Sequence, residues 1–333
     1  MKAKKFLKQK KAMEFNFEWI FAMIAGAAIL VLAVYGAVRF SQTLRYQQDS
    51  ELAKEFSIAL DPMQAGFAEG KSSIIKFNQE TKINNVCESG GYGSNRVSAS
   101  SKSNVGDKWL NAGAETIIKN KYLFTSLDSS KNYIVFSKQL SIGFKVADLI
   151  FLTSNNYCFI NPPSEIEDEI RVFQIPNFKL NSQNCANSSI NVCFSSAKTR
   201  QERTKQKCNM TVRGTCTGCN SEYEQGYIEK QNKRYFYTGS LMYGAIVSDY
   251  NLYTCNVQRL LYRLSGITGL YIKKGDMMSS RQCYTNLKPE LELFKNATEI
   301  ASKSGRFDSA FSSIASAAKE LDKKNSQEVC EIW

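Results

Sequence analysis

Ten cysteines are the side chains of this 333-residue chain that are best suited to chemistry. An even set of cysteines confined to one part of a chain is typical of a disulfide framework in a protein that folds outside the cytoplasm. Each bridge would stabilise the fold by about 2–4 kcal/mol, mostly by restricting the unfolded chain. We therefore expect structural disulfides, with their connectivity open, among Cys87, Cys158, Cys185, Cys193, Cys208, Cys216, Cys219, Cys255, Cys283 and Cys330.

The only CxxC motif, formed by Cys216 and Cys219 in "CTGC", allows two other interpretations. It could be a redox couple in which the surroundings lower one thiol pKa, although redox motifs usually open a helix after a strand. It could also supply two ligands of a four-thiolate zinc site, together with Cys193 and Cys208. A zinc ribbon normally has two such motifs, so structural disulfides are favoured over both alternatives.

Histidine is absent from the chain. This excludes the Ser–His–Asp and Cys–His mechanisms, the HExxH metalloproteases and every mixed Cys/His zinc site. The neighbouring acids Glu165, Glu167, Asp168 and Glu169 could be paired carboxylates of a glycoside hydrolase. Acidic side chains in the first turn of a helix are also what the helix dipole favours, and we assign these four that role.

Two further segments resemble binding motifs without completing them. "GGYGSN" at 90–95 lacks the Lys and Ser/Thr that follow a phosphate-binding loop, so a flexible loop is expected there. The basic run "KTRQERTKQK" at 198–207 could bind an acidic polymer, or could be a solvated loop between two cysteines. We predict no catalytic residue, no cofactor and no bound metal, and therefore a protein that is not an enzyme.

An apolar segment near the amino terminus predicts where the rest of the chain is located. Trp19 to Val38 are 20 consecutive residues without a charge, the length that spans the roughly 30 Å hydrocarbon core of a bilayer. The aromatic side chains of Trp19 and Tyr35 suit the headgroup region at its two ends. A buried core helix and a cleaved signal peptide are the alternatives. We expect a retained single-pass anchor in contact with membrane lipid, because a signal core is shorter.

Charge predicts the orientation of this anchor. Basic residues near a span stay on the cytoplasmic side, and residues 1–11 contain no acid but six lysines, Lys2, Lys4, Lys5, Lys8, Lys10 and Lys11. The carboxyl-terminal part is therefore expected outside the cell membrane. The net charge of +12 comes in good part from this leader, so we expect no nucleic-acid partner.

Periodicity divides the rest of the chain. We expect a cytoplasmic leader at 1–12, an anchor helix at 13–40, a helical stalk at 41–63, a strand-rich region at 64–247 and a helical region at 248–333. The stalk should end at the Asp61–Pro62 step. Ser164 and Glu167 should form a capping box, and a hairpin should turn near Gln231–Asn232–Lys233. Strands followed by helices predict a disulfide-stabilised α+β body.

The first 60 residues resemble archaeal type IV pilin-like precursors and tight-adherence minor pilins. The resemblance lies in the basic leader, the small residue Ala12 before Met13, and an early acid followed by an apolar helix. It implies processing between Ala12 and Met13. It also implies that Glu14 or Glu18 pairs with a neighbour's amino terminus during assembly, while the helix packs in a filament core.

The sequence therefore favours a non-enzymatic, membrane-anchored cell-surface protein, with a pilin-like structural or adhesion subunit as the sharper version. Self-assembly or binding of other envelope proteins would then involve the anchor helix. One alternative is an envelope thiol–disulfide oxidoreductase that uses Cys216 and Cys219. Another is a ligand-binding ectodomain that works with a separate membrane partner.

Overall fold

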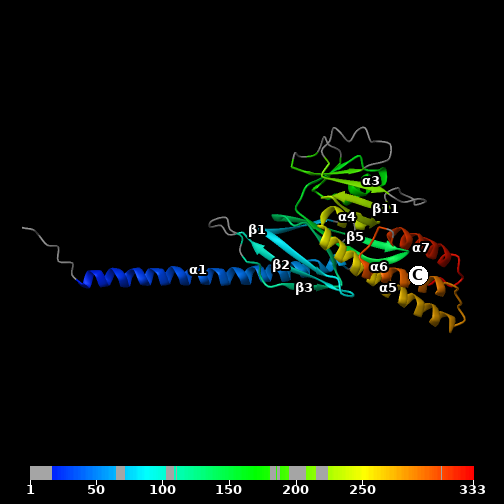
Figure 1. The fold of residues 1–333 in the computed structure, drawn as a ribbon, viewed down its shortest axis with the longest axis horizontal. Helices are drawn as coiled ribbons and strands as arrows, with labels where there is room; N and C mark the ends of the chain where they lie inside the picture. Colours follow the sequence, from blue (N-terminus) through cyan, green and yellow to red (C-terminus); the bar gives the residue numbers. More distant parts are fainter. Residues whose placement is uncertain are drawn as a thin grey trace, which may run out of the picture. The chain divides into compact units, whose positions relative to one another are not determined.

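The computed structural model describes residues 17–64, 72–102, 109, 111–180, 185, 188–194, 208–214, 224–308 and 310–333. The chain forms two compact units, Met1–Gln48 and Asp49–Trp333. The described part of the first unit is helical throughout. The second unit contains two β-sheets and all the remaining helices (Figure 1).

Helix α1 (Phe17–Ala59) runs without a break through the apolar segment and well beyond it. No proline occurs before Pro62, and the alanine- and leucine-rich sequence favours a helix. The helix ends just before the predicted Asp61–Pro62 step. The short helix α2 (Asp61–Gln64) follows, and its second residue is Pro62, at a position where the missing backbone N–H is not needed.

The first sheet has six strands, β1 (Ser72–Glu88), β2 (Ser94–Ser101), β3 (Thr116–Lys119), β4 (Tyr122–Thr125), β5 (Ser129–Ile142) and β6 (Phe144–Thr153). Their order across the sheet is β3-β2-β1-β5-β6-β4. Neighbouring strands are antiparallel, except that β4 lies parallel to β6.

Strand β6 of this sheet is buried on both faces. In β6, Leu149 and Phe151 belong to the larger hydrophobic core, whereas Ile150 and Leu152 belong to a second core on the opposite face. The larger core includes side chains of α4 and α5, and the second includes Phe56 of α1. Because both faces need apolar side chains, the strand is a continuous hydrophobic run rather than an alternating one.

The second sheet also has six strands, β7 (Tyr157–Ile160), β8 (Phe178–Leu180), β9 (Ile190–Phe194), β10 (Met210–Gly214), β11 (Gln225–Lys230) and β12 (Lys233–Thr238). Their order is β12-β11-β10-β9-β7-β8, antiparallel from β12 to β10 and parallel from there on. The predicted hairpin is confirmed. Gln231 and Asn232 both have positive φ, at 52° and 59°, as a two-residue type I′ turn requires.

Five helices complete the second unit, α3 (Ser164–Phe173), α4 (Leu241–Val247), α5 (Tyr250–Ser279), α6 (Lys288–Ser304) and α7 (Ala310–Asn325). The predicted capping box at α3 is wrong. Pro163 occupies the N-cap position with extended backbone, so Ser164 lies inside the helix and its Oγ donates to Glu165. The helix thus begins without a side-chain cap, although serine is a residue type favoured at the N-cap.

Both sheets and the carboxyl-terminal helices share one hydrophobic core, which confirms the α+β class. Tyr243 of α4 lies close to Phe136 and Phe151 of the first sheet and to Phe178 of the second, with ring centroids 6.1–6.3 Å apart. The strand-rich and helical regions predicted from the sequence therefore fold together in the same compact unit.

The eight cysteines that the structure describes lie at disulfide distance in four pairs, Cys87–Cys255, Cys158–Cys185, Cys193–Cys208 and Cys283–Cys330. The predicted disulfide framework is thus confirmed for these residues. The first pair joins β1 to α5 across 168 residues, and the third spans only 15. Cys216 and Cys219 lie outside the described residues.

The loop lengths predict unequal contributions to stability. Loop-closure entropy gives about 5 kcal/mol for the Cys87–Cys255 bridge and about 3 kcal/mol for Cys193–Cys208. We expect the double variant Cys87→Ser/Cys255→Ser to lower the free energy of unfolding more than Cys193→Ser/Cys208→Ser does. Urea unfolding of each protein in the same detergent measures both. Equal losses, or the reverse order, would contradict this assignment.

Candidate functional site

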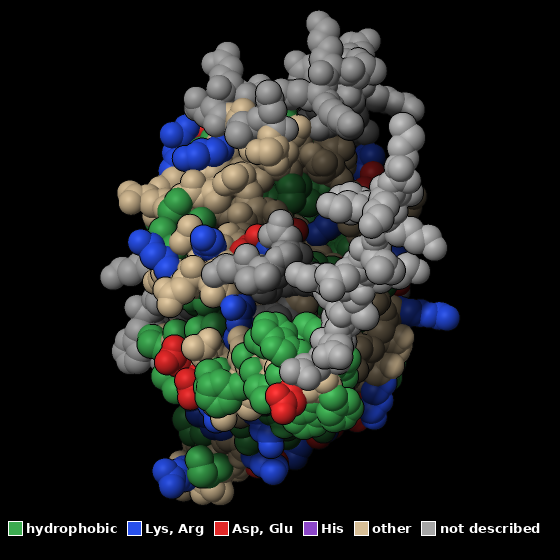
Figure 2. Space-filling model, turned by 90° about the vertical axis from the view of Figure 1, so that its left-hand side faces the viewer, with side chains coloured by type: hydrophobic (Ala, Val, Ile, Leu, Met, Phe, Trp, Pro, Cys, Tyr) green, Lys and Arg blue, Asp and Glu red, His purple; other side chains and the backbone are tan. Residues whose placement is uncertain are grey.

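The candidate functional site is helix α1. Among the described residues, it is the one helix that is long and apolar enough to cross a membrane. The side chains of its apolar segment are exposed, among them Phe21, Leu30 and Leu32. Figure 2 views the molecule from the side at which the amino-terminal end of α1 lies in Figure 1, and hydrophobic side chains gather around this end of the helix. Exposed apolar side chains over this length suit lipid and not water, so this part of α1 is suited to insertion in a bilayer.

The carboxyl-terminal part of α1 belongs to the second unit and binds it through polar contacts. The carboxylate of Asp49 is 1% exposed, and its Oδ2 accepts hydrogen bonds from the backbone N and the Oγ of Ser101, each at 3.2 Å. The backbone N of Ala114 donates to the Oγ of Ser50 at 2.8 Å. Two polar groups on one turn of α1 thus bind two different segments of the first sheet region.

Gly113 allows the backbone of α1 to approach this closely. A Cβ atom at position 113 would lie 2.5 Å from the backbone N of Ser50 and 2.6 Å from the carbonyl carbon of Asp49. Any other residue would force the helix away from the body. Glycine is therefore required here by close backbone approach.

Apolar contacts and one cation complete this docking surface. Ala53, Phe56 and Leu60 are almost fully buried against the first sheet. The ammonium group of Lys121 donates to the carbonyl oxygen of Ser57 at 3.3 Å, near the carboxyl end of α1, and lies 2.5 Å from a carboxylate oxygen of Asp61. A cation at a helix carboxyl end is favoured by the helix dipole.

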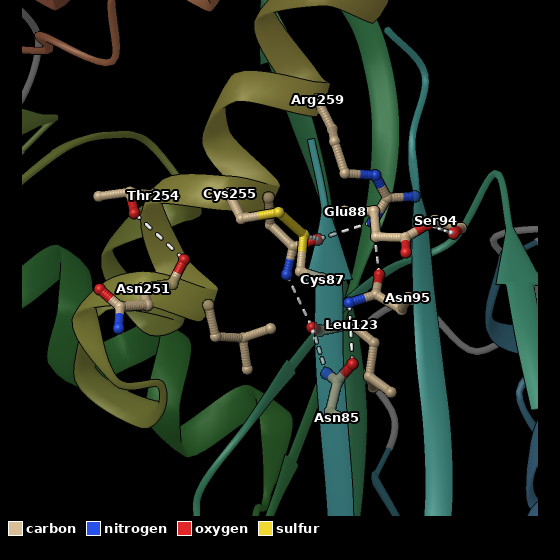
Figure 3. The surroundings of a disulfide bond; sticks show 12 residues. Asn85, Cys87, Glu88, Ser94, Asn95, Leu123, Asn251, Thr254, Cys255 and Arg259 are labelled. Atoms are coloured by element: carbon tan, nitrogen blue, oxygen red, sulfur yellow. Dashed lines mark hydrogen bonds between the residues drawn. A yellow bond between two sulfur atoms is a disulfide. The ribbon is translucent and has the colours of Figure 1, made fainter. Parts of the chain in front are cut away.

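A second polar cluster holds α5 to strands of the first sheet and to the turn between β1 and β2 (Figure 3). Arg259 of α5 is fully buried. Its guanidinium donates to the side-chain oxygens of Asn95 and Asn256 and to the backbone oxygens of Tyr92 and Lys121, at 2.5–3.1 Å. Figure 3 shows this side chain extending toward the strands beside the Cys87–Cys255 bridge.

The charge of Arg259 is balanced by dipoles. Among the described residues no carboxylate forms an ion pair with it, and the ring of Tyr122 lies 4.8 Å from its guanidinium carbon. Burial lowers the pKa of Arg259 to about 10, so the group stays protonated at neutral pH. Three of its contacts join α5 to the first sheet and the turn between β1 and β2, and the fourth is to Asn256 of α5 itself, which indicates a structural role.

The loop predicted at 90–95 is a turn over residues 90–93, and Ser94 and Asn95 already belong to β2. Gly91 and Gly93 have positive φ, and the segment forms the turn that joins β1 to β2. The ring of Tyr92 packs edge-on against Tyr262 with centroids 5.0 Å apart, and its carbonyl accepts from Arg259. The glycines allow the turn, and α5 fixes it in place.

Lys230 is another cation whose donors bind carbonyl groups. Its ammonium donates to the backbone oxygens of Ile246 and Ser248, both at 2.8 Å, at the carboxyl end of α4. Burial lowers the pKa of Lys230 to about 8. Both contacts satisfy the end of a helix, so the shifted pKa has a structural explanation.

The residues singled out in the sequence are dispersed. Ala12, Met13, Glu14 and the basic run at 198–207 lie outside the described residues, and Glu18 is exposed in the first turn of α1. Cys193 and Cys208 pair with each other, which removes two ligands from the zinc alternative. The acids near 165–169 lie on α3 as expected, where Glu167 pairs with Arg171 and Glu169 with Lys138.

Sequence reasoning missed Asp49, Gly113 and Arg259. A signal for the first exists, because Asp49 shares one face of α1 with Ala53, Phe56 and Leu60 at spacings of four, three and four. A charge aligned with an apolar helix face indicates a buried and hydrogen-bonded acid. No local signal marks the other two, since their partners are distant in sequence.

Within the described part of the chain, no cluster of His, Cys, Asp or Glu is arranged to hold a metal ion. Comparison with protein-family models, with curated proteins and with solved structures finds no match. The functional interpretation therefore depends on the geometry of the chain itself.

The docking of α1 predicts a stability effect of Asp49. In Asp49→Ala, the backbone N–H and the hydroxyl of Ser101 lose a buried acceptor, which should cost about 1–3 kcal/mol of unfolding free energy. The control is Glu51→Ala, which removes an exposed acid two residues away and should change stability by about 0.5 kcal/mol or less. Urea unfolding compares the two. Equal unfolding midpoints would show that the buried acid does not hold α1.

Proposed function

We propose that this chain is a non-enzymatic, membrane-anchored extracytoplasmic protein in which α1 holds the folded unit Asp49–Trp333 at the outer face of a membrane. The observation that carries the proposal is that one unbroken helix contains both the apolar segment and the docked residues from Asp49 to Ala59.

The four disulfide pairs support the extracytoplasmic side for the body. Such bridges form and persist in oxidising compartments and are rare in the cytoplasm. The lysines at 2–11 favour the opposite side for the amino terminus. Disulfides and charge thus agree on the same orientation although they are independent properties of the sequence.

The finer proposal is a pilin-like structural or adhesion subunit. It rests on the resemblance of the first 60 residues and on Glu18, which is exposed in the first turn of α1. An exposed acid at that end of the helix is accessible to the charged amino terminus of a neighbouring copy. Assembly would then bring anchor helices of several copies together through their apolar side chains.

The orientation can be tested with introduced cysteines. Asn16→Cys and Asn296→Cys place one thiol just before α1, on the retained side of the proposed cut after Ala12, and one on the exposed surface of α6. We expect a membrane-impermeant maleimide to label Asn296→Cys on intact cells and Asn16→Cys only after lysis. The wild-type protein gives the background. Labelling in the reverse pattern, or recovery of the protein without membranes, would refute the membrane topology.

The pilin-like version predicts a shortened chain. If a leader is removed after Ala12, intact-mass analysis of the protein from its native membrane should give a mature chain that begins at Met13. Ala12→Leu replaces the small residue that precedes the cut and should leave the leader attached. A native chain that begins at Met1 would eliminate this version while leaving the anchored-protein proposal standing.

A further inference from the structure

A cavity of about 340 Å³ lies where β12, the start of α5 and residues 305–308 meet. Its size is at the lower end of small-molecule sites, which suits one ring-sized group. Two arginines, Arg234 and Arg306, line it together with the single acid Asp308. None of these residues belongs to the docking surface of α1 or to the Arg259 cluster.

The guanidinium group of Arg234 is exposed and forms only one long ion pair with the described residues, so it can still bind an anion. Its Nε lies 3.8 Å from one oxygen of Glu229, but the other oxygen of that carboxylate accepts from Arg213 at 2.9 Å. Glu229 is thus largely neutralised by Arg213. The guanidinium carbon of Arg234 lies 5.0 Å from the ring centroid of Tyr227, which holds it in place without using its hydrogen-bond donors.

Arg306 is exposed and forms no ion pair with any described residue. Two guanidinium groups against one carboxylate give the cavity a net positive charge. Arginine binds carboxylates with two parallel, charge-assisted hydrogen bonds. The charged groups therefore favour an anionic ligand.

Aromatic residues form much of the remaining wall. Phe236 and Tyr250 are half-buried there, so part of each ring can contact a ligand. Tyr235 also lines the cavity, and its buried hydroxyl lacks a hydrogen-bond partner within the described chain. An unsatisfied buried hydroxyl costs free energy, which a polar group bound beside it would relieve.

The sheet edge at this cavity is closed to an added peptide strand. β12 is an edge strand of the second sheet, and such an edge can bind an extended peptide through its outward backbone groups. Here the hydroxyl of Tyr253 donates to the carbonyl oxygen of Phe236 at 2.6 Å and so occupies one of those groups. This contact favours a compact ring over an extended acidic peptide.

We propose that this cavity binds a carboxylate-bearing sugar unit of an anionic polysaccharide. The carboxylate would bind Arg234 and Arg306, and the sugar ring would lie against Phe236 or Tyr250. The proposal rests on the proposed function, because a surface protein meets such polymers outside the cell. It gives the adhesion version of that function a ligand class and a site.

The test uses the full-length protein in detergent and titration calorimetry with trigalacturonic acid. We expect binding by the wild type, and at least a tenfold loss of affinity in Arg234→Ala/Arg306→Ala, because two charge-assisted contacts are removed. Arg281→Ala removes an exposed arginine on another part of the surface and should bind like the wild type. Urea unfolding of the double variant establishes that it folds.

Three further probes define the ligand class. Fully methyl-esterified trigalacturonate keeps the rings and lacks the charge, and it should bind at least tenfold more weakly. Inorganic phosphate and tetraglutamate carry charge without the sugar ring and should not compete. Absence of trigalacturonate binding, binding unaffected by the two arginine substitutions, or equal affinity for either competitor would overturn the proposal. Because no membrane is involved, none of these results depends on the topology experiment.

Discussion

The burial of the carboxyl-terminal turns of α1 against the first sheet is the interaction on which the rest of the structure depends. Phe56 and Leu60 cover one face of that sheet, where Val97 and Ile150 are also buried. Without the helix, that face would be an exposed apolar surface of a kind that promotes aggregation. Residues 49–60 are therefore an integral part of the body as well as the end of the anchor.

A second part of the same sheet depends on α5. Arg259 and Asn256 donate to carbonyl groups of residues 92, 121 and 123, and the Cys87–Cys255 bridge lies beside them. These carbonyl groups belong to turns and strand ends, where backbone partners within the sheet are scarce. A buried arginine surrounded by neutral acceptors tolerates no sliding of α5, because each displaced carbonyl would leave a buried donor unsatisfied. The disulfide bridge and the buried arginine thus both fix the contact between α5 and the first sheet.

The sequence was informative where structure is determined locally. The unbroken apolar run in α1, the turn at Gln231–Asn232 and the change to helical period after Asp249 all follow from neighbouring residues, and the structure agrees with them. The capping box failed because the helix begins one residue earlier than the serine pattern predicts, with Pro163 at the N-cap and no side-chain cap. The ordering of residues 90–95 could not be foreseen, since the group that holds their turn is distant in sequence.

The same reasoning applies to the candidate site. The exposed apolar segment of α1 was predictable, because suitability for membrane insertion requires only length and apolarity. Its docking was not, since it combines Asp49 with Ser101 and Gly113, which no spacing rule connects. Cysteine connectivity was unpredictable for the same reason, although participation in bridges followed from the even number and the predicted compartment.

The surroundings of the described bridges favour structural over redox roles. A redox-active thiol needs exposure and a nearby cation that stabilises its thiolate. Cys158 is fully buried and Cys193 nearly so, within a small apolar cluster, where burial disfavours the thiolate. Cys87 lies near the cation of Arg259, but the hydrogen-bond donors of that guanidinium already bind four other groups. The chemistry that these surroundings favour for the described sulfur atoms is therefore to hold the folded unit Asp49–Trp333 together.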